Sequence, residues 1–229
     1  MNNLKVNLNN VRSRLDLACG NAGRSPSEVR ILAVSKQHPE GRIRELYQLG
    51  QRAFGENYVQ EALAKQALLG DLEIEWHFIG PLQSNKTREV AQNFHWVQSA
   101  DRKKILQRLS AQRPESLPDL NVCIQVNIDR EEQKSGVMPE QLEELLQYVS
   151  GLEHLKLRGL MAIPKPAAAD HDPAGSYQRM QELFHGLNTS GMALDTLSMG
   201  MSADLEQAIA HGSTMVRIGT DLLGTRDRH

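Results

Sequence analysis

The regular alternation of short apolar runs with longer helical segments is the feature of this sequence that most restricts its fold. The predicted strands are rich in β-branched and other apolar residues and lie at 31–36, 52–57, 74–80, 94–99, 122–128, 155–163, 196–200 and 214–219. Between them, Leu, Ala and Met recur at three- and four-residue steps, as on one face of a helix. This spacing predicts helices at 40–49, 58–69, 84–92, 101–111, 139–149, 174–190 and 202–211. Such an order predicts a parallel sheet, either closed into a barrel or doubly wound.

A closed barrel accounts for the chain best. Its 229 residues suit one (β/α)8 barrel, whose usual size is ~250 residues. No GxGxxG motif follows the first predicted strand and no residues remain for a second domain, which argues against a doubly wound nucleotide-binding fold. An additional N-terminal helix is predicted from apolar residues at steps of four and three, namely Leu4, Leu8, Val11, Leu15 and Ala18. We therefore expect an α/β chain in which residues 1–229 form a single TIM-barrel domain with one extra helix.

Composition argues against several classes of function. Charged residues make up 24% of the chain and nearly cancel to a net charge of −2, so the basic stripe of a nucleic-acid binder is missing. Cys19 and Cys123 form no CxxC pair or His/Cys cluster, which argues against a metal site and favours a reducing cytoplasm. Polar residues interrupt the apolar steps of the first 20 residues, so neither a signal peptide nor a membrane span is expected there.

Lys36 stands at the end of the first predicted strand. The active site of a barrel forms at the C-terminal ends of its strands, and inward-facing residues alternate along each strand. Leu32, Val34 and Lys36 share one face, so Lys36 is predicted at the barrel mouth. Partial burial lowers the pKa of a lysine and makes its amine a usable Schiff-base nucleophile. The alternative is a lysine whose stem packs on apolar surface while its amine stays in water.

Glycine, a hydroxyl residue and a helix start follow both of the last two predicted strands. The seventh predicted strand ends in Ser198, Met199 and Gly200 and is followed by Ser202, and the eighth ends in Gly219 and is followed by Thr220. Barrels bind phosphate at this position, because backbone N–H groups and the helix dipole favour an anion. Ser202 is expected to cap the helix after the seventh strand. The alternative is ordinary turn chemistry between strand and helix, which also uses Gly and Ser.

Arg217 is predicted to point into the barrel. Met215 and Arg217 share one face of the last strand, while Val216 and Ile218 suit the face that helices cover. A buried guanidinium needs an acceptor, either a ligand atom or an inward acid such as Glu56. With a strand-one lysine and a phosphate cradle, these residues favour an aldehyde that carries a phosphate, for which pyridoxal 5′-phosphate (PLP) is the obvious candidate.

Several motifs together resemble one protein family. AVSKQ, FGENYVQE, EWHFIGPLQSNK, KSG, GLMAI and LSMGMSADLEQAIAHGSTMVRIGT occur in order along nearly the whole chain. They resemble the pyridoxal phosphate homeostasis proteins, single-domain relatives of the alanine racemase N-terminal barrel. The resemblance implies that Lys36 holds PLP as a Schiff base and that Arg217 faces the pyridine nitrogen. It also implies a cofactor-binding set of Asn57, His77, Asn85, Ser198, Gly200, Met201, Ser202, Gly219 and Thr220. For His77 the alternative is a core histidine with satisfied hydrogen bonds.

The resemblance implies a carrier rather than an enzyme. An arginine opposite the pyridine nitrogen disfavours its protonation and weakens the ring as an electron sink. The chain also ends after the eighth unit, so the second domain of the racemases is not expected. We therefore expect a monomeric, non-catalytic protein of PLP homeostasis that stores, buffers or transfers the cofactor, in part through transient contact with apo PLP-dependent enzymes. The alternatives are a weak PLP-dependent amino-acid racemase and a Schiff-base aldolase for a sugar phosphate.

Three positions qualify this expectation. His38 stands where many relatives carry a second lysine after the Schiff-base lysine. Asp221 falls in the first turn of a helix that should meet a phosphate, where an inward carboxylate would weaken binding, so we expect it to point outward. Lys134 of the KSG motif is a second candidate attachment point for the aldehyde, and a solvated loop lysine is the alternative.

Overall fold

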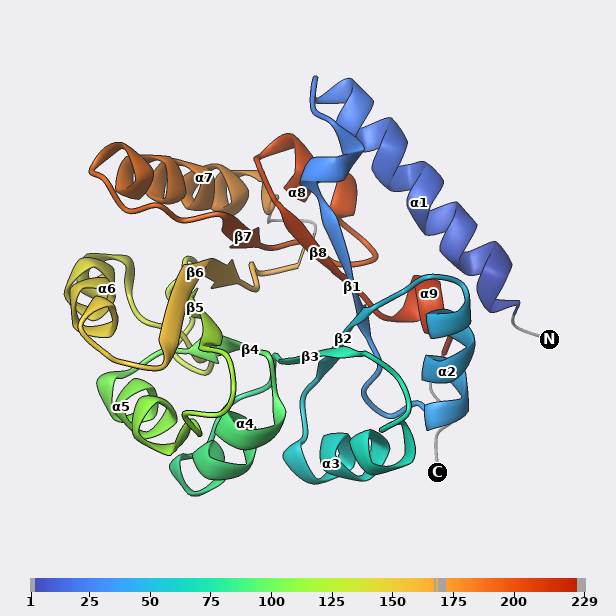
Figure 1. Cartoon of the computed structure of the whole chain (residues 1–229). Helices are drawn as coiled ribbons and strands as arrows, with labels where there is room; N and C mark the ends of the chain where they lie inside the picture. The colour runs from blue at the N-terminus through green and yellow to red at the C-terminus, as the bar shows by residue number, and fades with distance from the viewer. Residues whose placement is uncertain (1–2, 167, 169–171, 226–229) are drawn as a thin grey trace.

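Eight parallel strands close into a barrel, with β8 paired to β1 (Figure 1). The computed structural model describes residues 3–166, 168 and 172–225. Each predicted strand is confirmed, with its ends moved by a few residues. The strands are β1 (Arg30–Val34), β2 (Ala53–Glu56), β3 (Glu75–Phe78), β4 (Trp96–Ala100), β5 (Leu120–Val126), β6 (Leu155–Ala162), β7 (Thr196–Ser198) and β8 (Met215–Ile218).

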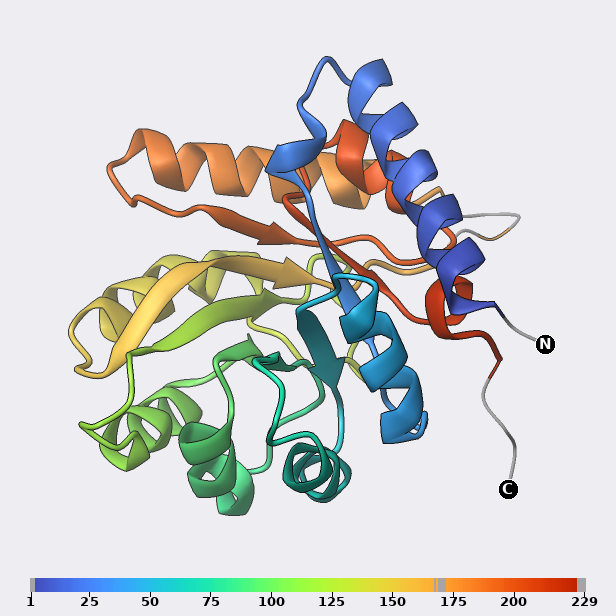
Figure 2. The same cartoon turned by 45° about the vertical axis from the view of Figure 1, so that its right-hand side comes forward.

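Helices surround the strands, and each predicted helix is present. The main ones are α1 (Leu4–Asn21), α2 (Glu40–Gln48), α3 (Val59–Leu68), α4 (Thr87–Asn93), α5 (Lys103–Gln112), α6 (Leu142–Ser150), α7 (Ala174–Thr189), α8 (Leu205–Ala210) and α9 (Thr220–Leu223). The predicted helices at 84–92 and 139–149 begin with the 3-10 turns η2 (Ser84–Lys86) and η3 (Pro139–Gln141). The extra N-terminal helix, α1, packs beside α8 and α9 (Figures 1 and 2).

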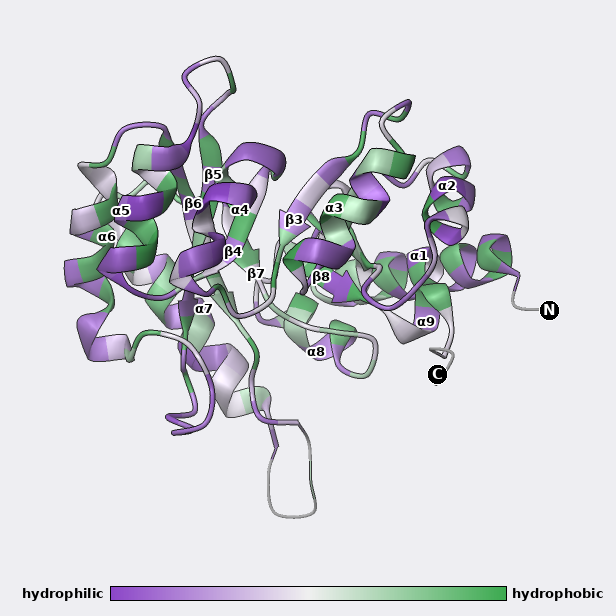
Figure 3. Cartoon of the chain, turned by 90° about the horizontal axis from the view of Figure 1, so that it is seen from below, coloured by the Kyte–Doolittle hydropathy of each residue, from purple (hydrophilic) through white to green (hydrophobic). Residues whose placement is uncertain are grey.

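The buried apolar residues form one main core around the barrel and two smaller clusters inside it. The main core lies between the strands and the helices, which turn their apolar faces inward (Figure 3). Two smaller clusters fill the barrel itself, and one of them contains Leu32, Val34 and Met215. Val216 and Ile218 belong to the outer core. The predicted alternation on the first and last strands is therefore confirmed, and it places residues 36 and 217 at one end of the barrel.

Among the described residues, no helix is both long and apolar enough to cross a bilayer.

Candidate functional site

A cavity of about 260 Å³ opens where the C-terminal ends of β1 and β8 meet the loops that follow. Val34, Ile79, Ile163 and Ala203 contribute to its wall, together with most of the residues predicted to bind a cofactor. The lining is Val34, Lys36, Asn57, Ile79, Ile163, Met201, Ser202, Ala203, Arg217, Gly219 and Thr220. The structure thus brings Lys36, Arg217 and the two predicted phosphate segments to one cavity.

The loop that carries Lys36 is fixed on both sides. Lys36 follows β1 by two residues, and the Ser35 hydroxyl donates to Glu56 Oε1 at 2.7 Å. Lys65 Nζ on α3 donates to the Ser35 carbonyl at 2.7 Å, and the Gln37 N–H donates to Glu61. Gln37 has φ of +60°, a conformation that residues other than Gly, Asn and Asp rarely adopt. Outside contacts therefore hold the backbone in the shape that directs Lys36 to the cavity.

Three charged residues provide these contacts, and we call them the Lys36 clamp: Glu56, Glu61 and Lys65. Lys65 Nζ lies 2.7 Å from Glu56 Oε1 and 2.6 Å from Glu61 Oε1. The Glu56 side chain is fully buried. Burial raises the pKa of Glu56, and the charge and hydrogen bond of Lys65 oppose the rise. Sequence reasoning missed the clamp, although the spacing of Glu61 and Lys65, four residues apart on a predicted helix, is a signal for an ion pair.

Arg217 forms part of the cavity wall and is almost fully buried. Its guanidinium donates from Nη1 to the Ser198 carbonyl at 2.8 Å and the Ser198 hydroxyl at 2.9 Å, and from Nη2 to the Ala162 carbonyl at 2.8 Å. Burial lowers the pKa of Arg217 to about 10, so the group stays charged at neutral pH.

The alternative prediction, that Glu56 is the acceptor for Arg217, is wrong. Phe54 and Glu56 share the outward face of β2, because Phe54 belongs to the core under the helices while Ala53 lies inside the barrel. Glu56 therefore meets Lys65 on α3 instead of Arg217. Among the described residues, Arg217 forms no ion pair with a carboxylate. Its acceptors are neutral oxygens.

The two predicted phosphate segments meet at the cavity, with one difference from expectation. Thr220 begins α9, as predicted. The expected cap by Ser202 is wrong, because Asp204 is the N-cap residue of α8 and its carboxylate accepts from the Met201 N–H at 2.6 Å. The Ser202 hydroxyl instead accepts from the Asp221 N–H at 3.4 Å. Ser202 thus links the two segments.

Asp221 points away from the cavity, as expected. Its carboxylate pairs with Arg14 of α1 and is not among the groups that line the cavity. Arg14 also pairs with Glu206 on α8 at 2.7 Å. The extra N-terminal helix therefore holds the acidic residue of the last predicted phosphate segment on the outer surface.

Four predicted site residues lie outside the cavity wall. Ser198 is fully buried beneath Arg217, and Gly200 adopts φ of +93° with its space closed off by Ala208. His77 lies deeper in the barrel, because Ile79, two residues further along the chain and just past the end of β3, occupies the position at the cavity. Asn85 is exposed in η2.

A second cavity of about 240 Å³ adjoins the first and shares Asn57, Ile79 and Ile163 with it. Lys134 lines this second cavity, and its amine pairs with Glu131 at 2.6 Å. Asn57 Oδ1 is buried without a hydrogen-bond partner among the described residues. Buried polar atoms of this kind ordinarily have a partner, so the boundary of the two cavities suits a ligand that donates a hydrogen bond.

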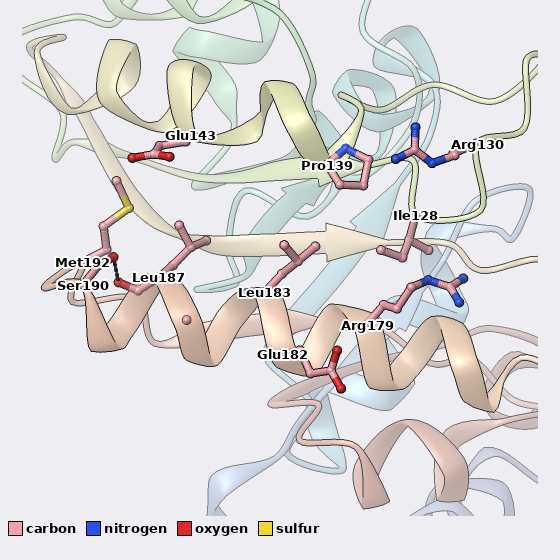
Figure 4. Close-up of a pocket in the computed structure, with 11 residues that line it drawn as sticks. Ile128, Arg130, Pro139, Glu143, Arg179, Glu182, Leu183, Leu187, Ser190 and Met192 are labelled. Atoms are coloured by element: carbon pink, nitrogen blue, oxygen red, sulfur yellow. Dashed lines mark hydrogen bonds between the residues drawn. The ribbon is translucent and has the colours of Figure 1, made fainter.

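A larger groove lies elsewhere, between α6 and α7, and measures about 630 Å³ (Figure 4). Leu183, Leu187 and Met192 line it, and none of the predicted site residues does. Two arginines at one end are already engaged in ion pairs, Arg130 with Glu140 and Arg179 with Asp129. Across the described ranges, no three His, Cys, Asp or Glu residues gather as a metal site.

Comparison with known proteins agrees with this geometry. The family described as alanine racemase, N-terminal domain, matches residues 6–227. The pyridoxal phosphate homeostasis protein of Pseudomonas aeruginosa is 54% identical over 227 residues, which cover 99% of this chain and 97% of that protein. This chain belongs to the pyridoxal phosphate homeostasis proteins. The member of this family from Escherichia coli K12 is 50% identical over 230 residues, which cover 99% of this chain and 98% of that protein.

Solved structures place the family within the same barrel fold. PipY of Synechococcus elongatus is similar with a TM-score of 0.86 and 37% identity, over 97% of this chain and all of that chain. A second structure of PipY, with PLP bound, has a TM-score of 0.84 and 36% identity. An alanine racemase from Clostridium difficile has a TM-score of 0.71 at 16% identity and is covered over 58% of its length, a likeness that shows the fold alone.

Proposed function

We propose that this protein binds PLP in the 260 Å³ cavity and takes part in PLP homeostasis, by storing, buffering or transferring the cofactor. The observation that carries the proposal is the arrangement of a lysine, a buried arginine and two hydroxyl-bearing backbone segments around one cavity. The orphaned Oδ1 of Asn57 at the same cavity suits a polar ligand. PipY, which is 36% identical, has been solved with PLP bound.

Each group has a role in this proposal. The Lys36 amine supplies the nucleophile for reversible covalent attachment of the aldehyde. Arg217 directs a donor toward the pyridine nitrogen, and the backbone around Ser202 and Thr220 faces the phosphate. PLP, when bound, supplies an electrophilic carbonyl and a conjugated ring. The protein's part would be to orient these atoms and to leave the end of the cavity at Lys36 accessible to a competing amine.

We propose that the protein is a carrier without strong catalytic activity. A charged arginine beside the pyridine nitrogen disfavours protonation of that nitrogen, and an unprotonated ring is a weaker electron sink. The relatives described above are named for homeostasis and not for a reaction. A monomer in the cytoplasm that meets apo PLP-dependent enzymes transiently fits this role. A weak amino-acid racemase is the alternative, and it would exchange the α-proton of alanine or serine with solvent.

The first prediction concerns Lys36. Purified protein mixed with PLP should show the visible absorbance band of a Schiff base, and Lys36→Ala should lose that band completely because the nucleophilic amine is gone. Lys134→Ala is the matched control and should keep the band and a stoichiometry of about one PLP per chain. A wild-type protein that stays colourless with added PLP would refute the proposed cofactor and favour the sugar-phosphate aldolase.

A further inference from the structure

A chain of buried polar side chains crosses the barrel interior below the cavity. Arg217 Nη1 donates to Ser198 Oγ at 2.9 Å, and Ser198 Oγ donates to Gln98 Oε1 at 2.6 Å. Gln98 Nε2 lies 2.9 Å from His77 Nδ1, and His77 Nε2 lies 2.7 Å from Glu75 Oε1. The chain therefore connects β8, β7, β4 and β3 and ends at the guanidinium in the cavity wall.

The direction of each hydrogen bond in this chain is determined. Burial opposes ionisation of Glu75, but His77 and Arg30 together hold its pKa at about 2, so its carboxylate only accepts. His77 must then carry its proton on Nε2, and its Nδ1 accepts from the Gln98 amide. The Gln98 oxygen consequently faces Ser198 and accepts a hydrogen bond from its hydroxyl. This leaves a lone pair of Ser198 Oγ directed at Arg217.

His77 is neutral in this arrangement. Burial lowers its pKa to about 4, although Glu75 pulls the value upward. Its ring stacks on Trp96 with centroids 5.0 Å apart, which fixes the plane in which Nδ1 meets Gln98. Gln98 also donates to the Met215 sulfur at 3.1 Å. The glutamine is thus held in one orientation from both ends.

At the cavity, this series of hydrogen bonds fixes the orientation of Arg217. Three of the five N–H donors of the Arg217 guanidinium are engaged with Ser198 and Ala162. Those bonds fix the plane of the guanidinium, so the donors that remain have a defined direction. Gln98 and His77 are fully buried and do not touch the cavity. A leucine of similar volume would fill the place of Gln98 and would need no polar partners. A glutamine at this buried position therefore indicates a role for its hydrogen bonds.

We propose that Gln98 is a positioning residue for Arg217, acting through the Ser198 hydroxyl and kept in orientation by His77. The inference deepens the proposed function and rests on it for the identity of the ligand. In this account Gln98 sets the direction of the guanidinium toward the pyridine nitrogen of PLP, while it makes no contact with PLP itself.

The experiment compares wild-type protein with Gln98→Leu, first without cofactor. Rotation about the Cζ–Nη bonds of Arg217, measured by NMR of the ¹⁵N-labelled side chain, should be about tenfold faster in the variant, because the Ser198 hydroxyl loses its acceptor and is no longer held with a lone pair toward Nη1. Should Gln98→Leu fail to fold, Ser198→Ala removes the same link and is expected to give the same result.

PLP binding provides the second readout. Titration followed by absorbance should give a dissociation constant about tenfold higher for Gln98→Leu, together with a shifted band maximum. Gln51→Leu is the matched control, because Gln51 is also buried and donates to the Ile31 and Ala53 carbonyls at 2.8 Å, away from Arg217. It should lower stability without changing rotation or the band.

Unchanged Arg217 rotation together with unchanged PLP affinity in Gln98→Leu would overturn the inference. An effect of Gln51→Leu equal to that of Gln98→Leu would overturn it as well, since the cause would then be general loss of stability. If wild-type protein binds no PLP, the proposed function fails, and the rotation of Arg217 in the unliganded protein alone decides whether Gln98 positions it.

Discussion

Replacing Lys65 by methionine is expected to lower the free energy of unfolding by about 3–5 kcal/mol at neutral pH, because it leaves a buried carboxylate without its charge partner. Glu56 is completely buried, and Lys65 is 8% exposed. The second carboxylate oxygen of Glu56 has no hydrogen-bond partner among the described residues. Lys65 therefore supplies most of the compensation for the buried charge. Denaturant unfolding of both proteins measures the difference.

Two further variants test this cause. Lys86→Met removes a pair with Glu89 that is about one-third exposed on both sides, and its cost should stay below about 1 kcal/mol. Lys65→Met combined with Glu56→Gln should recover part of the loss, since the unpaired charge is gone. A cost for Lys65→Met equal to that for Lys86→Met would contradict the role assigned to the Lys36 clamp.

Lys65→Met is also expected to affect the cavity, because Lys65 supports the loop that carries Lys36. Lys65 donates to the Ser35 carbonyl, and Glu61 accepts from the Gln37 N–H. Without Lys65, one support of the strained loop around Lys36 is lost. We therefore expect weaker retention of PLP in Lys65→Met than in Lys86→Met, measured on protein that remains folded at the temperature of the assay.

Gly159→Ala is expected to be the most destabilising single substitution in the barrel, with a loss of more than about 4 kcal/mol or failure to fold. A Cβ at Gly159 on β6 would lie 1.7 Å from the Thr196 carbonyl oxygen on β7. Both groups belong to the backbone of paired strands, so neither can move aside without separating the strands. The Ala162 and Ser198 carbonyls that hold Arg217 lie on the same two strands.

Gly186→Ala provides the control for this prediction. Gly186 lies within α7, and a Cβ there would meet nothing within 4 Å. Alanine is favoured over glycine inside a helix by about 1 kcal/mol, so this variant should be neutral or slightly stabilised. Thermal unfolding measured side by side separates the two, and similar midpoints for both variants would refute the close approach of β6 and β7.

The fold and the meeting of Lys36 and Arg217 at one cavity could be predicted from sequence because both follow from local periodicity. Alternation along β1 and β8 directs Leu32, Val34 and Arg217 inward, and parallel strands end at the same edge. The expectation for Glu56 failed because a two-residue period leaves open which face of β2 is buried in the barrel. Phe54 and Glu56 take the outer face, where Lys65 on α3 can reach.

Other parts of the site depend on contacts between segments that are distant in sequence. Gln98 meets Ser198, 100 residues away, only because the closed barrel brings β4 opposite β7. The depth of His77 depends on how far β3 extends toward the cavity, and Ile79 takes the place that the motif suggested for the histidine. The Ser202 cap failed because Asp204 competes for the helix start. The hydropathy pattern of the sequence alone therefore does not predict these contacts.

The central claim is that Lys36 is the residue that holds PLP. Reduction of the PLP-loaded protein with borohydride, followed by mass mapping of its peptides, tests it most directly, because reduction converts the reversible C=N bond into a stable amine. We predict one labelled lysine per chain, at Lys36. Label on another lysine, such as Lys134, with Lys36 unmodified would contradict the account.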